Sequence, residues 1–161
     1  MTRAFHYPLR ALCPDYAGAA AGLSLSFALL GFVELALPIA WVAAAVAVLF
    51  LVYFARTICR QLTKIELDES GIRVRGPAFS PTCASIRWED LRLLRLDYYS
   101  TRRDGEGGWM QLRLGDAQRR IRIDSDLDGF AELVRAAARE AAQRHLAIDA
   151  ATLSNLKAIQ R

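Results

Sequence analysis

The sequence is poor in the residues that build catalytic and metal sites. Its 161 residues include two histidines, His6 and His145, near opposite ends of the chain, and three cysteines, Cys13, Cys59 and Cys83, without CxxC spacing. No histidine dyad, zinc site or disulfide framework is therefore expected. These absences predict a non-enzymatic protein that needs no cofactor and resides in a reducing compartment.

Other ligand-binding motifs are incomplete. The glycine-rich stretch 105–108 (GEGG) lacks the lysine of a phosphate-binding loop, so a hairpin tip is expected there. Asp124, Asp126 and Asp128 alternate as in a calcium loop, but the glycine and distal glutamate of such a loop are missing, and helix capping is the favoured explanation. Lys and Arg are interspersed with Asp and Glu, so nucleic acid is not expected as a partner.

A long stretch near the N-terminus lacks charge. Between residues 17 and 55 the only ionisable side chains are Glu34 and Tyr53. Two apolar runs, 17–33 and 39–55, approach the ~20 residues that cross the ~30 Å core of a bilayer as a helix. Because Glu34 and Pro38 fit a tight turn between them, residues 16–56 are predicted to form a transmembrane helical hairpin.

The apolar runs allow two other interpretations. A cleaved signal peptide followed by one span is disfavoured, because no small-residue cleavage site closes the first run. A buried hairpin inside a soluble protein is disfavoured, because the rest of the chain is too small to surround two such helices.

Basic residues near the runs predict the orientation. Arg3 and Arg10 precede the first run, Arg56, Arg60 and Lys64 follow the second, and the turn has no Lys or Arg. By the positive-inside rule, both termini are expected in the cytoplasm, at the inner membrane of a bacterium. The three basic residues after the second run are candidate contacts for anionic lipid headgroups.

Small residues in the first run suggest close helix packing. Gly18 and Gly22 form a GxxxG spacing, which lets another helix approach closely. The neighbour is either a helix of a partner or the second helix of the same hairpin, and the second interpretation is favoured. Glu34 lies beside the turn, so its carboxylate is expected to reach water rather than to act within the membrane.

The remaining two-thirds of the chain shows the alternation of strands and then the periodicity of a helix. Antiparallel strands are expected at 62–67, 72–75, 85–88, 91–99, 109–114 and 119–123, with a bulge at Leu93–Leu94. Ser125 and Asp126 are expected to cap an amphipathic helix that continues to about Leu146, and a short helix is expected over 150–159.

Three of these segments carry a resemblance. The run 65–72 (IELDESGI), the corner 86–91 (IRWEDL) and the helix start 129–133 (GFAEL) resemble the bacterial pleckstrin-homology-like domains of small membrane proteins, over about Leu62 to Leu146. The resemblance implies a small antiparallel β domain capped by a C-terminal helix, and roles in binding or assembly rather than chemistry. It also implies a seventh strand, for which the stretch between Phe79 and Ile86 is the expected place.

One surface run combines basic and aromatic residues. In the stretch 98–104 (YYSTRRD), Arg102 and Arg103 are candidates to grip a phosphate or carboxylate beside an aromatic wall of tyrosines and Trp109. A solvated turn, in which these arginines pair with Asp104 and Glu106, is favoured over such a site.

The expected chain is thus an α+β protein with a cytoplasmic N-terminal segment (1–15), a transmembrane hairpin (16–56), a pleckstrin-homology-like β domain with its capping helix (57–146) and a short C-terminal helix (147–161). The expected function is that of a membrane-anchored interaction module that binds a protein partner. The alternatives are a small accessory subunit or assembly factor of a membrane complex, and a lipid-headgroup-binding protein. The expected partners are membrane lipids and either another protein or a second copy of the chain.

Overall fold

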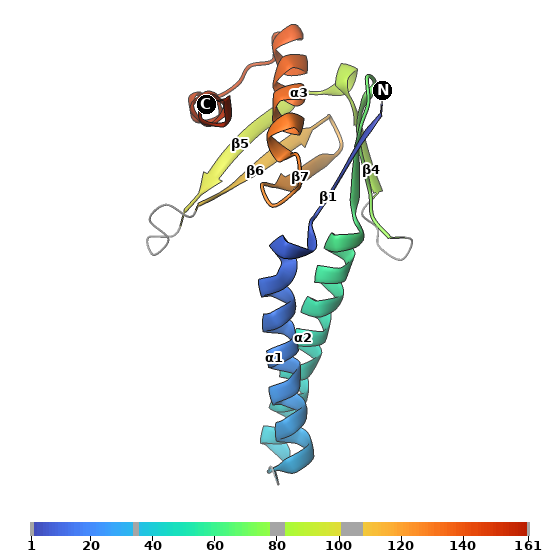
Figure 1. Ribbon diagram of the computed structural model, residues 1–161, viewed down its shortest axis with the longest axis vertical. Helices are drawn as coiled ribbons and strands as arrows, with labels where there is room; N and C mark the ends of the chain where they lie inside the picture. The colour runs from blue at the N-terminus through green and yellow to red at the C-terminus, as the bar shows by residue number, and fades with distance from the viewer. Residues whose placement is uncertain (1, 34–35, 78–82, 101–107, 161) are drawn as a thin grey trace. The chain divides into compact units, whose positions relative to one another are not determined.

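The structure, a computed structural model, describes residues 2–33, 36–77, 83–100 and 108–160 (Figure 1). It divides into two compact units. One unit comprises Met1–Tyr7 together with Thr63–Arg161, and the other comprises Pro8–Leu62. The first unit is a domain of strands and helices and the second is a helical hairpin, so the expected α+β class is confirmed.

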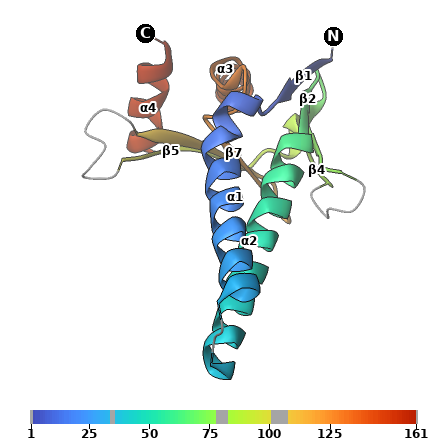
Figure 2. The same cartoon turned by 60° about the horizontal axis from the view of Figure 1, so that its bottom comes forward.

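Two long helices, α1 (Leu9–Phe32) and α2 (Leu37–Leu62), form the hairpin and lie side by side along their length (Figures 1 and 2). The buried residues of α1 are Leu12, Ala19 and Ser26, which are spaced seven apart and therefore lie on one face of the helix. The apolar runs in the sequence mark only the uncharged parts of these helices, since both helices extend into polar sequence at the ends away from the turn.

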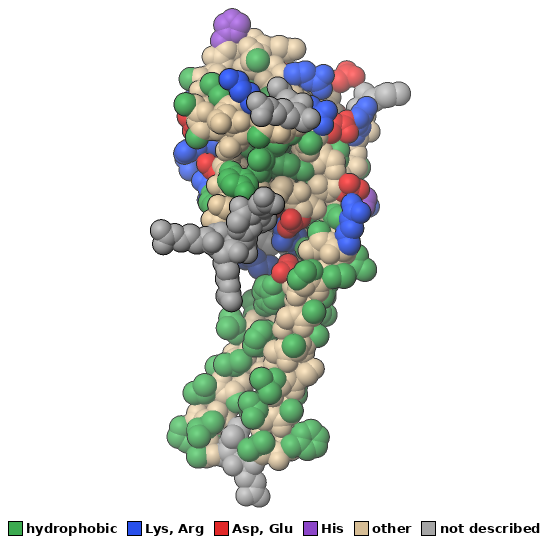
Figure 3. Space-filling model, turned by 60° about the vertical axis from the view of Figure 1, so that its left-hand side comes forward, with side chains coloured by type: hydrophobic (Ala, Val, Ile, Leu, Met, Phe, Trp, Pro, Cys, Tyr) green, Lys and Arg blue, Asp and Glu red, His purple; other side chains and the backbone are tan. Residues whose placement is uncertain are grey.

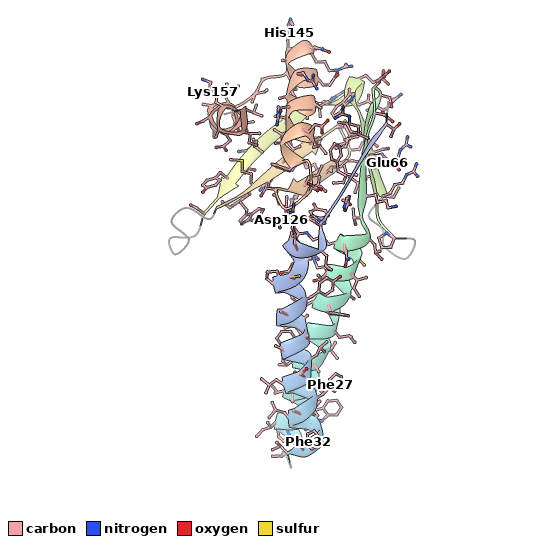
Figure 4. The ribbon with its side chains drawn as sticks, in the orientation of Figure 1. Phe27, Phe32, Glu66, Asp126, His145 and Lys157 are labelled. Carbon is pink, nitrogen blue, oxygen red and sulfur yellow. The ribbon has the colours of Figure 1, made fainter. Side chains whose placement is uncertain are left out.

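Both helices are long and apolar enough to cross a membrane. Within their most apolar stretches, 11% of the α1 residues and 6% of the α2 residues are buried, unlike the core helix of a soluble protein. Phe27 and Phe32 project outward from the hairpin, with 63% and 91% of their surface exposed (Figure 4). The hairpin by itself therefore presents an apolar surface.

The described part of the domain contains two antiparallel sheets and two α-helices. The first sheet has the order β1 (Arg3–His6), β2 (Lys64–Leu67), β3 (Gly71–Arg75) and β4 (Cys83–Arg87). After a 3-10 turn (Trp88–Asp90), the second sheet has the order β5 (Leu93–Tyr99), β6 (Trp109–Gly115) and β7 (Arg120–Asp124). The helices α3 (Phe130–Gln143) and α4 (Ala150–Gln160) follow. The antiparallel strands and the short last helix match the expectation.

The strand β1 differs from the expectation. Residues 1–15 were expected to form a separate N-terminal segment, but Arg3–His6 pairs with β2 in register from Arg3↔Leu67 to His6↔Lys64. The helical hairpin is therefore inserted between two neighbouring strands of one sheet. Only Tyr7, Pro8 and Thr63 lie between the strands and the helices. The structure thus has an additional strand before the hairpin, while most of the stretch in which a seventh strand was expected, residues 79–82, lies outside the described residues.

Contacts with the start of α3 also hold β1 in the domain. Phe5 is buried, and its ring lies 2.6 Å from where a Cβ on Gly129 would be. Gly129 has a φ of 74°, a conformation that glycine adopts without strain. The amide of Asp128 donates to the carbonyl of His6 at 3.1 Å, and Arg3 pairs with Glu132. These contacts make β1 an integral strand.

The core follows the period of two expected for strands and the helical period of α3. Helix α3 lies over one face of the second sheet (Figure 1). The buried strand residues include Ile65, Ile72, Ile86, Leu94, Leu96, Leu112, Leu114, Ile121 and Ile123, and those of α3 are Phe130, Leu133, Val134, Ala137 and Ala141.

Two local predictions were wrong. The pairing of β5 with β6 is continuous from Leu93↔Gly115 to Tyr99↔Trp109, so no bulge occurs at Leu93–Leu94. The alternation shifts there because Leu91 belongs to the preceding turn, where its amide donates to the carbonyl of Trp88.

The start of α3 is also later than expected. Ser125 does not cap the helix. It continues the strand pairing instead, because its amide donates to the carbonyl of Met110 and its hydroxyl accepts from the amide of Met110. The helix begins at Phe130, after Gly129, without a side-chain cap.

The corner 86–91 packs against the turn between β2 and β3. The indole Nε1 of Trp88 donates to the carbonyl of Asp68 at 3.1 Å, and its amide donates to the carbonyl of Ser70 at 2.9 Å. The Asp68 carboxylate accepts hydrogen bonds from Ser70 and from the amide of Gly71, which lowers the pKa of that carboxyl. The two longest segments that carried the family resemblance are therefore in direct contact.

Helix α4 packs on the domain at the edge of the second sheet. The Thr152 hydroxyl accepts from the amide of Leu96 at 3.1 Å, and the Asn155 side-chain amide donates to the carbonyl of the same residue at 2.7 Å. Asp149 accepts from the Thr152 amide at 2.7 Å and forms an ion pair with Arg95 at 3.2 Å. The side chains of α4 thus bind both backbone groups of Leu96 on β5.

The attachment of α4 should depend on pH through Asp149. Hydrogen bonds from Thr152, with a smaller contribution from Arg95, lower the pKa of this carboxyl below its ordinary value of 3.8. A carboxyl with a lowered folded-state pKa contributes stability above its unfolded-state pKa and loses that contribution as the pH falls through the folded-state value. Asp149→Asn should therefore reduce the hydrogen-exchange protection of α4 near pH 7, and its difference from wild type should disappear well below pH 3.8.

Protection factors from hydrogen exchange with mass spectrometry, corrected for intrinsic rates, measure this effect on the full chain in detergent. Asp128→Asn, which alters an exposed aspartate outside α4, is the control and should leave α4 unchanged. A deficit in Asp149→Asn that is the same at pH 7 and below pH 3 would contradict the assignment.

Candidate functional site

No metal centre is present in the described part of the chain. Within residues 2–33, 36–77, 83–100 and 108–160, no three His, Cys, Asp or Glu side chains are grouped to hold a metal ion. The candidate sites are therefore surfaces. They are a polar cluster in the hairpin, the glycines of α1, and the basic residues.

A polar cluster joins α1 to α2 at the end of the hairpin away from its turn. The hydroxyl of Tyr53 donates to Oδ1 of Asp15 at 2.7 Å. Arg60 approaches the other oxygen of the same carboxylate at 3.8 Å. One acidic side chain on α1 therefore holds two side chains that lie two turns apart on α2.

The neighbouring residue on α1 adds a second connection. The hydroxyl of Tyr16 donates to the side-chain oxygen of Gln61. The Tyr16 ring also meets Phe54 edge to face, with 5.6 Å between the ring centroids and an angle of 74° between the planes. These contacts fix the register of the two helices at this end.

Sequence reasoning did not identify Asp15 as a functional residue. The first helix was predicted from the uncharged run 17–55, so Asp15 was expected to lie before it. In the structure α1 begins at Leu9 and therefore includes Asp15. The sequence nevertheless contains a pattern that points to this contact between the helices. In an antiparallel hairpin, residues at equal distances from the turn face each other, and polar residues flank both apolar runs at matching distances.

The two glycines of the GxxxG spacing have different surroundings. A Cβ at Gly22 would overlap the ring of Phe50 on α2, so this glycine lets the two helices approach each other. A Cβ at Gly18 would meet nothing within 4 Å. The interpretation that the hairpin itself uses this spacing therefore holds for Gly22 and not for Gly18.

The structure does not gather the predicted basic residues into one cluster. Arg56 is exposed on α2, and Arg60 is engaged with Asp15. Lys64 belongs to the other unit, where it lies on β2 directly between His6 on β1 and Arg75 on β3. His6, Lys64 and Arg75 thus form a row across the end of the first sheet at which the chain enters and leaves the hairpin.

The predicted anion-binding run 98–104 is described only in part. Arg102 and Arg103 lie outside the described residues, as does Glu34. Part of the predicted aromatic wall lies within the described residues. Tyr99 and Trp109, which are opposite each other on β5 and β6, stack with 4.7 Å between their centroids, and Arg113 donates to the Tyr99 hydroxyl.

The charged side chains are distributed differently from the apolar ones. In the face shown in Figure 3, hydrophobic side chains are spread along the hairpin, and most of the Lys, Arg, Asp and Glu side chains lie on the domain. Fold and surface together define a protein class: an α+β domain interrupted by two helices that are long and apolar enough to span a membrane.

Comparison with known proteins adds no relative to this description. No family model matches the chain, and neither the curated proteins nor the solved structures include a significant match.

The two glycines provide a matched pair of substitutions. Gly22→Leu should destabilise the hairpin by about 1–3 kcal/mol, because the new side chain competes with Phe50 for the same space. Gly18→Leu should leave the stability of the isolated chain unchanged. Thermal unfolding in detergent, followed by circular dichroism, measures both variants.

Equal destabilisation by the two substitutions would contradict the helix packing. The same pair also tests whether α1 docks against a partner. If it does, Gly18→Leu should release a co-purifying protein without loss of hairpin stability.

Proposed function

We propose that this chain is a non-enzymatic, membrane-anchored interaction module. Its hairpin spans the inner membrane of a bacterium, and its domain is held in the cytoplasm to bind a protein partner. The observation that carries the proposal is the insertion of an exposed apolar hairpin between β1 and β2 of the domain.

The exposed side chains of the hairpin support the membrane assignment. A contiguous apolar surface of this kind is costly in water and is suited to lipid. It includes Leu25, Phe27, Phe32, Ile39, Trp41, Val42, Val48, Leu49, Leu51 and Val52, each more than half exposed.

The pairing of β1 with β2 supports an even number of spans. Because His6 lies opposite Lys64, the chain must enter and leave the hairpin on the same side of the membrane. The basic residues on both sides of the hairpin favour the cytoplasm as that side. Cleavage after the first helix would remove a strand that the domain contains, which speaks against a signal peptide.

The strand order supports a pleckstrin-homology-like domain. Its elements are a four-stranded antiparallel sheet, a three-stranded antiparallel sheet and a following helix, which give the number of strands that the resemblance implies. The contact of Trp88 with the turn at Asp68 joins two of the segments that resemble that family. Domains of this class bind partners without a conserved chemistry, which agrees with an interaction role.

One observation favours a second candidate function. Gly18 lies on α1 with open space around it, which suits close approach by a helix of another membrane protein. An accessory subunit or assembly factor of a membrane complex would use this face. The exposed Arg56 and Lys64 suit contacts with lipid headgroups in either case.

Cysteine accessibility in whole cells and in lysates tests the anchoring. In a chain with Cys13 and Cys59 replaced by serine, the exposed native Cys83 on β4 should react with a membrane-impermeant maleimide only after lysis. After Cys83 is also replaced, Ala36→Cys, next to the turn, should react in whole cells once the outer membrane is permeabilised.

Val46→Cys, in the middle of α2, is the control and should react only in denaturant. Labelling of Cys83 in intact cells, or failure of Ala36→Cys to react from outside, would overturn the proposed topology.

A further inference from the structure

Strand β5 forms one edge of the second sheet. This strand pairs with β6 on one side, and among the described residues the sheet order places no strand on the other side. An edge strand presents backbone groups that can pair with another chain, and proteins usually cover such an edge. Here the cover is α4, whose Thr152 and Asn155 bind the amide and carbonyl of Leu96.

The cover is a single short helix attached by few side chains. Thr152 and Leu156 are its buried residues, while Leu153 on the same helix is 46% exposed. Beyond the two hydrogen bonds to Leu96, it is held by the ion pair between Asp149 and Arg95, whose side chains are 41% and 48% exposed. Such an attachment is weak enough to be exchanged for another set of contacts.

The sequence of β5 is complementary to itself in antiparallel pairing. If two copies pair with Leu96 opposite Leu96, then Arg95 of each copy faces Asp97 of the other. Leu94 then faces Tyr98 on the opposite side of the sheet. Opposite charges that face each other across antiparallel strands stabilise the pairing, and the two-fold axis makes this contact twice.

A second β5 would provide the same contacts as α4. The amide and carbonyl of Leu96 would bond to Leu96 of the second copy instead of Thr152 and Asn155. The ion-pair partner of Arg95 would be Asp97 of that copy instead of Asp149, and that Asp97 would be shared with Arg113 of its own chain, which it contacts at 3.1 Å. The two occupants thus satisfy the same groups and exclude each other.

We propose that the edge of β5 is a surface at which two copies of this chain associate, with β5 pairing antiparallel to β5 about Leu96, and that α4 closes this edge in the single chain. The two three-stranded sheets then join into one continuous sheet. This inference goes beyond the anchoring role and does not depend on whether the hairpin spans a membrane.

Release of α4 tests the proposal in the full chain in detergent. The double variant Thr152→Val with Asn155→Leu removes both hydrogen bonds to Leu96 and should lower the dimer dissociation constant by roughly tenfold or more, because the competing occupant is weakened. Analytical ultracentrifugation in density-matched detergent measures the constant. Lys157→Ala, an exposed change on the same helix (Figure 4), is the control and should have no effect.

Charge reversal identifies the surface. Added to the release variant, Arg95→Glu places like charges opposite each other twice and should abolish the dimer, although it also removes the partner of Asp149. The further changes Asp97→Arg and Arg113→Gln restore opposite charges across the axis without placing an arginine against the ion-pair partner of Asp97, and should restore the dimer.

Two outcomes would overturn the proposal. One is a release variant that stays monomeric while hydrogen exchange shows that α4 has lost its protection. The other is a dimer that Arg95→Glu leaves intact, since it would form through the hairpin or another face. If the double variant does not fold, Asp149→Asn decides instead, because it loosens α4 while keeping both hydrogen bonds and should shift the equilibrium in the same direction.

Discussion

The antiparallel pairing of β1 with β2 brings together two stretches of chain that the whole helical hairpin separates. Closing so long a loop costs conformational entropy, although the cost grows slowly with length. The hairpin reduces this cost, because α1 and α2 pack against each other and bring their outer ends together. The polar cluster around Asp15 and the close approach at Gly22 hold that arrangement. Helix packing and strand pairing therefore support each other, and each is weaker without the other.

The pairing of β1 with β2 makes the N-terminal residues part of the domain. Without Arg3–His6, the first sheet loses an edge strand, and the two residues directly before α3, Asp128 and Gly129, lose their contacts with His6 and Phe5. A fragment that starts after the second helix is therefore an incomplete domain. The same constraint shapes the proposed function, because the chain connects the domain to the hairpin at two points, through Tyr7–Pro8 and Thr63, rather than through one flexible linker.

The sequence predicts most elements whose own residues carry a periodic pattern. The alternation of β2, β3, β6 and β7 and the amphipathic period of α3 each need only local information. What it does not predict depends on distant partners. β1 is four residues (RAFH) without a usable alternation, and its partner lies beyond the hairpin. The first turns of α1 contain Arg10, Pro14 and Asp15, which a search for uncharged residues leaves out. The start of α3 is shifted because Ser125 bonds to Met110 on the neighbouring strand, a contact that no local capping rule includes.

A disulfide between β1 and β2 tests the insertion most directly. Ala4 and Glu66 are directly opposite each other, so Ala4→Cys with Glu66→Cys, in a chain without its three native cysteines, should oxidise rapidly to an intramolecular crosslink in membranes. Ala4→Cys with Arg73→Cys is the matched control, because Arg73 lies one strand further away and should remain reduced. Rapid crosslinking of the first pair alone is the result that the inserted hairpin requires. No crosslink in that pair, or equal crosslinking of both pairs, would contradict it.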